Sequence, residues 1–387
     1  MSRRRLFGSL LGLVFLVNLA RIVFAPLLEP LAADFGVTAA ALGPVATAAW
    51  LGSALPRLPT GYLLTKVPRH YVVVGSGAVL TVAALATASA PSVPALAGGA
   101  LLMGLASGTY FIAANPLVSE LFPDRVGSAL GVHGMASQLA AVGAPLAVTA
   151  VLALGDWRTA FHAIAVLAAL VTVATALATR GATMPDAGTG DRDLLAAVRS
   201  QWRLIATGVA VIGAVSFVWN GLFNFYVSYL LVKGVTAATA RTLLTVVFGA
   251  GVPAFLVTGR LADRFPLVPL MLAIVAGFVV CLVALTSVSG LAALLAVSLV
   301  LGYVVHGLFP AMDAYLLGAL PDHHRASAYA AYSASMMVVQ ATGSSAVGAL
   351  VARGVVYDDV FRAFALGLVG VLAVLVVLWR TGRLPDG

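Results

Sequence analysis

The chain has 387 residues and a net charge of +8, and 61% of its residues are hydrophobic while only 9% are charged. Soluble domains carry about 25% charged residues, so this composition excludes a soluble protein and makes lipid the solvent for much of the chain. The positive charge would also suit a nucleic acid, but Lys and Arg collect on the cytoplasmic loops of membrane proteins, and we therefore expect no nucleic-acid partner.

Twelve segments are apolar and long enough to cross a bilayer, which takes about 20 residues. The sequence therefore predicts an all-α membrane protein with twelve transmembrane helices near residues 8–30, 42–64, 71–89, 94–119, 127–152, 160–180, 204–230, 240–262, 267–287, 291–317, 326–349 and 362–381. The first segment follows three arginines and continues through Arg21 without a cleavage-site pattern, so we interpret it as a retained span and not as a signal peptide.

A polar segment, 181–203, separates the sixth and seventh helices. It predicts a cytoplasmic linker between an N-terminal six-helix bundle, 1–180, and a C-terminal six-helix bundle, 204–387. An even number of spans places both termini on one side of the membrane. Most of the 22 Lys and Arg residues lie on the loops of that side, which predicts a multi-pass protein of the cell membrane with both termini in the cytoplasm.

A short basic turn after the second helix recurs after the eighth. The matched pairs along the two halves, all at an offset of 198 residues, are Gly61 and Gly259, Lys66 and Arg264, Gly104 and Gly302, Asn115 and Asp313, and Pro123 and Pro321. Self-similarity at a fixed offset indicates a duplicated unit. Six spans return the chain to its starting side, so the two copies are parallel repeats, which are expected to face each other across a central cavity.

This architecture and its turns resemble the major facilitator superfamily, whose signature between helices 2 and 3 is roughly Gly-x-Leu-x-Asp-Arg-x-Gly-Arg. The second copy matches at Gly259, Leu261, Asp263 and Arg264, and the first copy keeps Gly61, Leu63, Lys66 and Arg69. The first copy has Thr65 where the family carries the acid.

The resemblance implies a secondary transporter that works by alternating access, in which these turns help to close the cytoplasmic side. It implies gating roles for Gly61, Lys66, Arg69, Gly259, Asp263 and Arg264. Asp263 would lie near the positively polarised start of the fifth helix, and the gate would be weaker at Thr65. The alternative is that the basic turns serve only to orient the chain in the membrane.

Four ionisable residues fall inside predicted spans, where a charge costs roughly 2.5–3.5 kcal/mol on insertion scales. Arg21 shares a helical face with Asn18, and Arg57 lies in the cytoplasmic half of the second helix. A guanidinium stays charged and fits a carboxylate or phosphate, so these three residues predict a site for an anionic solute. The alternative for Arg57 is an ion pair on the cytoplasmic side.

His306 and Asp313 are two turns apart on one face of the tenth helix and can both take up and release a proton. They are the candidates for proton coupling; the alternative for Asp313 is a pairing with an arginine of the other half. A polar stripe on the seventh helix contains Asn220 and Asn224, and Gln340 lies on the eleventh. These amides could bind the solute or join neighbouring helices.

Several kinds of site have no signal in the sequence. It contains no phosphate-binding Gly-x-x-x-x-Gly-Lys-Ser/Thr loop, no Cys/His cluster at metal-binding spacing and no Gly-x-Ser-x-Gly element, and its single cysteine, Cys281, excludes an intramolecular disulfide. We therefore expect no enzyme, no metal and no cofactor. His133, near the cytoplasmic end of the fifth helix, is interpreted as a structural residue in contact with water.

The resulting prediction is a monomeric transporter of a small anionic solute, coupled to protons. One alternative is an exporter of drugs or other hydrophobic compounds, in which Asp313 would bind the substrate; it is disfavoured because the first helix has Asn18 and Arg21 where such exporters carry an acid. A second alternative is a membrane sensor on the same scaffold that transports nothing.

Overall fold

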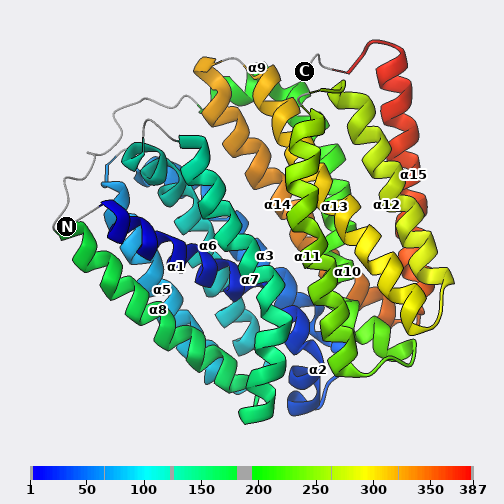
Figure 1. Cartoon of the computed structure of the whole chain (residues 1–387), viewed down its shortest axis with the longest axis horizontal. Helices are drawn as coiled ribbons and strands as arrows, with labels where there is room; N and C mark the ends of the chain where they lie inside the picture. The colour runs from blue at the N-terminus through cyan, green and yellow to red at the C-terminus, as the bar shows by residue number, and fades with distance from the viewer. Residues whose placement is uncertain are drawn as a thin grey trace. The chain divides into compact units, whose positions relative to one another are not determined.

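The computed structural model describes residues 3–64, 66–122, 126–180, 194–262, 264–320 and 322–384. Over these ranges the chain is helical and contains no strand (Figure 1). Twelve of the described segments are long and apolar enough to cross a membrane, which confirms the predicted number of spans. The chain divides into two compact units, Met1–Asp191 and Arg192–Gly387.

The first unit contains six spans, two of which are broken. Its elements are α1 (Arg3–Ile22), α2 (Phe24–Phe35), η1 (Ala39–Leu42), α3 (Gly43–Ala54), α4 (Arg57–Leu63), α5 (Arg69–Ala88), α6 (Val93–Leu121), α7 (Val126–Leu154) and α8 (Trp157–Arg180). The second span breaks at Leu55 and Pro56, because proline lacks the amide hydrogen that a continuous helix needs. Arg57 is therefore the first residue of a new helical segment.

The second unit is built in the same way. Its elements are α9 (Leu194–Gly208), η3 (Val209–Gly213), α10 (Ala214–Val232), α11 (Ala237–Ala262), α12 (Leu267–Ser287), α13 (Leu291–Ala319), α14 (Asp322–Ala352) and α15 (Tyr357–Arg380). The seventh span differs from the predicted 204–230, because its helical segment continues from Ala196 to Val232. It bends at Gln201 and passes through the π-helical turn η3.

The repeat is also present in the packing within each unit. A Cβ on Gly104 of α6 would lie 2.1 Å from the carbonyl oxygen of Ala49 in α3, and a Cβ on Gly302 of α13 would lie 2.1 Å from that of Val247 in α11. Both members of the first pair precede those of the second by the same 198 residues. Glycine is therefore required at the same helix crossing in both units.

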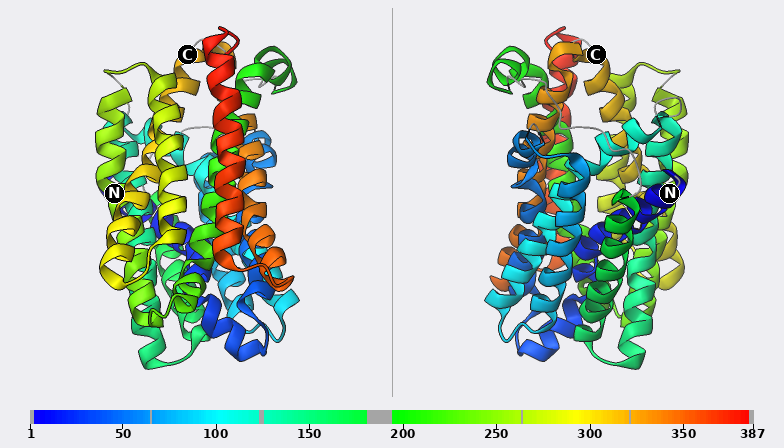
Figure 2. Two further views of the ribbon diagram at one scale, coloured as in Figure 1. Left: turned by 90° about the vertical axis from the view of Figure 1, so that its right-hand side faces the viewer. Right: turned by 90° about the vertical axis from the view of Figure 1, so that its left-hand side faces the viewer.

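The outer faces of the helices are apolar, as expected for contact with lipid. Figure 2 shows α15, drawn in red, as one uninterrupted helix along the second unit. Its side chains Leu366 and Val374 are 72% and 59% exposed. Such a surface would be unfavourable in water and is suited to a bilayer.

Candidate functional site

Arg21 is buried in the first unit without an acidic partner. Its side chain lies on α1 and is only 7% exposed. One terminal nitrogen donates to Oδ1 of Asn18 at 2.5 Å and the other to Oγ of Ser53 at 3.3 Å, while Nε has no hydrogen-bond partner. No carboxylate in the described ranges forms an ion pair with this guanidinium.

Two aromatic rings flank the Arg21 guanidinium. Its Cζ lies 4.7 Å from the ring centre of Trp50 on α3 and 5.3 Å from that of Phe111 on α6. Asn18 is held by a 2.6 Å hydrogen bond from its Nδ2 to the carbonyl of Ser137 on α7, which leaves Oδ1 facing Arg21. Cation–π contacts and amide oxygens stabilise a cation but leave its charge unneutralised.

Arg57 adds a second cation beside Arg21. Its Nε donates to the backbone carbonyl of Ser53 at 3.3 Å, so Ser53 accepts from Arg57 through the backbone and from Arg21 through its hydroxyl. The positively charged side chains of α1 and α4 therefore converge on one serine. This arrangement of two guanidinium groups and two rings is what we define as the Arg21 site: Asn18, Arg21, Trp50, Ser53, Arg57 and Phe111.

Sequence analysis had identified Asn18, Arg21 and Arg57 but not the other members of this site. Trp50 and Ser53 precede Arg57 by seven and four residues, a spacing that places all three on one helical face. That spacing was available from the sequence. The contribution of Phe111 depends on the packing of α6 against α1 and had no comparable signal.

His306 lies in an aromatic cluster of the second unit. Its Nδ1 lies 2.7 Å from the carbonyl oxygen of Gly302, so Nδ1 carries the hydrogen. Its ring centre is 5.3 Å from that of Trp219, 5.9 Å from Phe248 and 6.3 Å from Phe255. Gly251 makes room for it, because a Cβ there would lie 2.7 Å from the imidazole.

This cluster occupies the position in the repeat that corresponds to the Arg21 site. Trp219, Phe248 and Phe255 follow Arg21, Trp50 and Arg57 by 198 residues. Trp219 contacts Phe248 at 5.8 Å between ring centres, as Arg21 contacts Trp50. The two units therefore use one framework for different chemistry, cationic in the first and aromatic in the second.

Asp313 and the amides of the second unit have separate partners. Tyr329 donates to Oδ1 of Asp313 at 2.9 Å, and no hydrogen bond within the described structure joins Asp313 to His306. Ser344 of α14 donates to Oδ1 of Asn220 on α10 at 2.7 Å. That bond agrees with the helix-joining alternative for Asn220.

Two other amides of the predicted site are also buried. Asn224 is 1% exposed and its Nδ2 donates to the carbonyl of Asn220, while its Oδ1 has no partner. Gln340 is 5% exposed and lies one turn before Ser344 on α14. Neither residue reaches the surface.

An ion pair that sequence analysis missed lies at the repeated turn of the first unit. Arg69, at the start of α5, contacts Glu120 near the end of α6 at 3.0 Å. Burial raises the pKa of Glu120, and the charge of Arg69 acts in the opposite direction. Lys66 lies over the ring of Tyr62 at 4.7 Å.

The remaining gating predictions are less constrained by the structure. Thr65 and Asp263 lie outside the described residues. Arg264 is exposed, and a Cβ on Gly61 or Gly259 would meet no atom within 4 Å. Neither glycine is therefore needed for close packing within its own unit.

The interpretation of His133 as a residue in contact with water is wrong. Its side chain is only 2% exposed, because α7 turns it toward α6. Its Nε2 lies 3.0 Å from the hydroxyl of Tyr110, which is itself fully buried.

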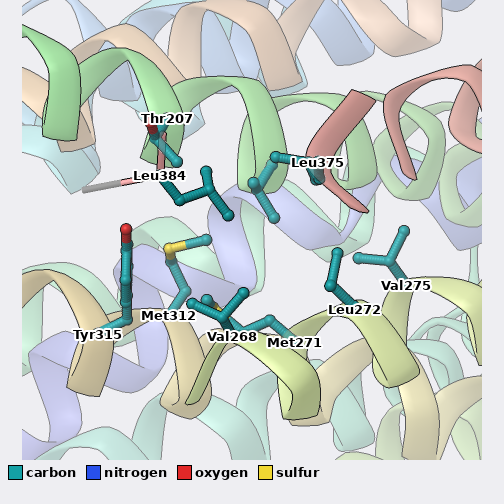
Figure 3. A pocket seen from close by; sticks show the side chains of 10 residues that line it. Thr207, Val268, Met271, Leu272, Val275, Met312, Tyr315, Leu375 and Leu384 are labelled. Carbon is teal, nitrogen blue, oxygen red and sulfur yellow. The ribbon is translucent and has the colours of Figure 1, made fainter. Parts of the chain in front are cut away.

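A small cavity in the second unit is lined by none of the predicted site residues (Figure 3). It has a volume of about 10 Å³ and is lined mostly by apolar side chains, among them Met271, Leu272 and Met312, together with Thr207 and Tyr315. A water molecule needs about 10–15 Å³ and polar partners. The cavity is therefore too small and too apolar to hold a solute.

Comparison with known proteins places the chain among membrane transporters. The sequence profile of the Major Facilitator Superfamily matches residues 10–285 and 233–386. The gentisate transporter of Corynebacterium glutamicum is 29% identical over 130 residues, which are 33% of this chain and 29% of that protein. The 4-hydroxybenzoate transporter PcaK of Pseudomonas putida is 34% identical over 118 residues, or 30% of this chain and 26% of that protein. The matched segments thus span less than a third of these relatives.

Solved structures show the same fold. A bacterial homologue of the human lysosomal transporter Spinster, in an inward-facing and occupied conformation, gives a TM-score of 0.81 at 15% identity, covering 98% of this chain and 97% of that chain. A D-xylose–proton symporter gives 0.77 at 15% identity, covering 95% and 96%. At such identities the similarity concerns the fold alone.

Proposed function

This chain belongs to the Major Facilitator Superfamily, and from that membership and the surroundings of Arg21 we propose that it transports small aromatic carboxylates by alternating access. The observation that carries the proposal is a buried guanidinium with neutral partners only, since Arg21 forms no ion pair in the described structure. A buried charge without a counterion is unfavourable. An incoming carboxylate would supply the missing charge.

The chemistry of the Arg21 site suits an aromatic acid in particular. A guanidinium presents parallel N–H groups that match the two oxygens of a carboxylate. Trp50 and Phe111 stand beside it and would offer faces for an aromatic ring. The two partial relatives named above carry gentisate and 4-hydroxybenzoate, both aromatic carboxylates, in their names.

For the second unit we propose a role in handling the proton that drives transport. The Nδ1 hydrogen of His306 is directed to the Gly302 carbonyl, and Asp313 accepts a hydrogen bond from Tyr329. These bonds hold each titratable side chain in a defined orientation. Asn220, Asn224 and Gln340 are buried amides on α10 and α14, and we propose that they adjust their hydrogen bonds as the solute binds. Cytoplasmic gating is proposed for Gly61, Lys66, Arg69, Gly259, Asp263 and Arg264, with Glu120 as the partner of Arg69.

The test is solute counterflow in proteoliposomes made with purified protein. Vesicles preloaded with unlabelled benzoate should accumulate labelled benzoate, and Arg21→Met should abolish this exchange. Arg180→Met, at the exposed end of α8, is the matched control and should exchange as the wild type does. Full exchange in Arg21→Met would overturn the assignment of the anion site.

The alternatives remain distinguishable in the same vesicles. Movement of lipophilic cations that depends on Asp313, with no carboxylate exchange, would indicate an exporter of hydrophobic compounds. Tight binding of a carboxylate without any flux would indicate a sensor. Either result would contradict the proposed function.

A further inference from the structure

His133 is a buried titratable residue whose hydrogen-bond geometry defines its neutral form. Tyr110 on α6 donates its hydroxyl hydrogen to the carbonyl of Leu10 on α1 at 2.6 Å. A hydroxyl has only one hydrogen, so at the 3.0 Å contact with Nε2 of His133 the imidazole must be the donor. His133 therefore carries its hydrogen on Nε2, and Nδ1 holds the free lone pair, to which no described residue donates.

The fold does not need this pair of polar residues. The positions 198 residues after Leu10, Tyr110 and His133 are Gly208, Leu308 and Ala331, none of which has a polar side chain. In the second unit, the space beside Gly208 is taken by the ring of Tyr332, which lies 2.9 Å from where a Cβ would stand. The same framework thus packs without a histidine, and His133 is specific to the unit that holds the Arg21 site.

One aromatic ring separates His133 from Arg21. Phe111 contacts the imidazole edge-to-face at 6.5 Å between ring centres, and the guanidinium of Arg21 lies 5.3 Å from the centre of the same ring. On the backbone of α7, one turn beyond His133, the carbonyl of Ser137 holds Asn18, which in turn accepts from Arg21. Both routes lie within the interface of α1, α6 and α7.

The charged and titratable groups around α7 are few. Tyr110 touches the imidazole and Arg21 lies across Phe111. The other described groups of this kind on the helices packed against α7 form no hydrogen bond, ion pair or ring contact with His133; they are Arg3, Arg4 and Arg5 of α1, Glu29 and Asp34 of α2, Glu120 of α6, and Arg158, His162 and Arg180 of α8. Among the described groups of the first unit, the Arg21 site is therefore the charge that most affects Nδ1.

From this geometry we infer that His133 is a proton-linked positioning residue: it takes up a proton at Nδ1 when a carboxylate occupies the Arg21 site. With the site empty, Arg21 is an unneutralised cation that opposes a second positive charge on the imidazole. A bound carboxylate removes that repulsion, so the anion and the proton favour each other. Linkage makes this effect reciprocal, and lower pH strengthens anion binding.

The inference rests on the proposed function, and its test is calorimetric titration of benzoate into the full-length purified protein. Benzoate keeps its carboxylate ionised between about pH 6 and pH 8, so a change of affinity across this range reports a titrating group of the protein. Wild-type affinity should rise toward pH 6, by a factor within the roughly 5–150-fold typical of coupled sites. Titrations in two buffers with different heats of ionisation should show a proton taken up with each anion.

His133→Gln is the decisive variant, because its amide can still donate to Tyr110 but cannot titrate. It should bind benzoate with no proton uptake and a flat pH profile. His162→Gln, an exposed histidine on α8, is the matched control and should keep the wild-type profile. Tyr110→Phe, which frees the imidazole from its fixed tautomer, should shift the profile without removing it.

Two results would overturn the inference alone. One is unchanged proton uptake in His133→Gln; the other is proton uptake that disappears in His306→Gln, which would assign the proton to the second unit. Absence of benzoate binding by the wild-type protein would instead contradict the proposed function. A lowered thermal midpoint would identify a misfolded His133→Gln protein. In that case the pH profile of benzoate affinity in Tyr110→Phe provides the test, because an unchanged profile would contradict the inference.

Discussion

At the scale of single residues, the charge of Arg21 is the feature that most needs an explanation. Neutral acceptors on Asn18 and Ser53 and the rings of Trp50 and Phe111 orient the guanidinium. They do not neutralise it, and Nε stays without a partner. The protein therefore retains an unfavourable buried cation, which is understandable if binding an anion compensates for it.

Replacing Arg21 separates its charge from its shape. Arg21→Lys keeps the charge but loses the planar pair of donors, and one lost charge-assisted hydrogen bond costs about 1.5–3 kcal/mol. We expect benzoate affinity to fall by roughly tenfold or more, measured by calorimetry. Equal affinity in Arg21→Lys would show that the carboxylate does not bind through the guanidinium fork.

The same site predicts an unusual stability result. Arg21→Met removes an uncompensated buried charge, so the thermal midpoint of the solute-free protein should be unchanged or higher. Benzoate at about 100 times its Kd should stabilise the wild type by about 2.7 kcal/mol and leave Arg21→Met unaffected. A much lower midpoint for solute-free Arg21→Met would mean that the cation is already compensated within the fold.

At the scale of helices, the repeated turn of the first unit carries an ion pair that the equivalent positions of the second unit cannot form. Arg69 and Glu120 join α5 to α6, whereas the residues 198 positions later are Leu267 and Gly318. The partial burial of Glu120 opposes its ionisation, and Arg69 offsets this effect. The two residues of the ion pair therefore contribute differently to stability, and replacing Arg69 or Glu120 should have different effects.

Removing Arg69 should cost more stability than removing the charge of Glu120. Because burial raises the pKa of Glu120, stability is lost as the pH rises from the ordinary pKa of a glutamate through this raised value. Arg69→Gln removes the charge that offsets this effect, so the ionised carboxyl becomes more destabilising. The loss in Arg69→Gln should accordingly recover as pH falls through the Glu120 pKa, while Glu120→Gln should show little loss at neutral pH. Thermal midpoints of both variants measured across this pH range test the prediction. Equal losses of stability in Arg69→Gln and Glu120→Gln would contradict it.

Helix crossings supply a second prediction at this scale. Gly104→Ala would place a methyl group against the backbone of α3, where no flexible side chain can yield. Gly98→Ala on the same helix meets nothing within 4 Å, so it should instead stabilise α6 by up to about 1 kcal/mol. Opposite shifts of the thermal midpoint are expected, and a neutral Gly104→Ala would disprove the close approach of α3 and α6.

At the scale of the whole molecule, a duplicated scaffold carries two kinds of chemistry. The first unit has cations, Arg21 and Arg57, at the positions where the second has the aromatic rings of Trp219 and Phe255. Duplication preserves backbone packing, because the crossing glycines tolerate no substitute. It leaves the side chains between those crossings free to diverge. In the proposed function, the first unit binds the solute together with a proton on His133, and the second unit handles the proton that drives transport.

Asp313 tests this proposed division of labour. In Asp313→Asn the carboxyl can no longer titrate, but the amide can still accept from Tyr329. We expect benzoate exchange to continue while a pH gradient no longer drives uphill accumulation. Uphill transport at the wild-type rate in Asp313→Asn combined with His306→Ala would remove both residues from proton coupling.

The sequence by itself determined the fold of this protein. Long apolar runs specify membrane spans because every backbone group must be satisfied within its own helix, and the offset of 198 residues specifies two six-helix repeats. Intramembrane charge also marked Arg21, Arg57, His306 and Asp313, because lipid penalises each of them wherever it lies along a span.

Only the tertiary structure decided how those residues are partnered. The partners depend on which faces of α1, α5, α6 and α7 meet. These contacts leave Arg21 without a carboxylate, pair Glu120 with Arg69, and pair His133 with Tyr110. Spacing along one helix predicts neighbours on that helix, such as Asn18 and Arg21. Contacts between helices depend on close packing around glycines far away in the chain, and the repeat alone could not show that equivalent positions would hold a cation in one unit and a ring in the other.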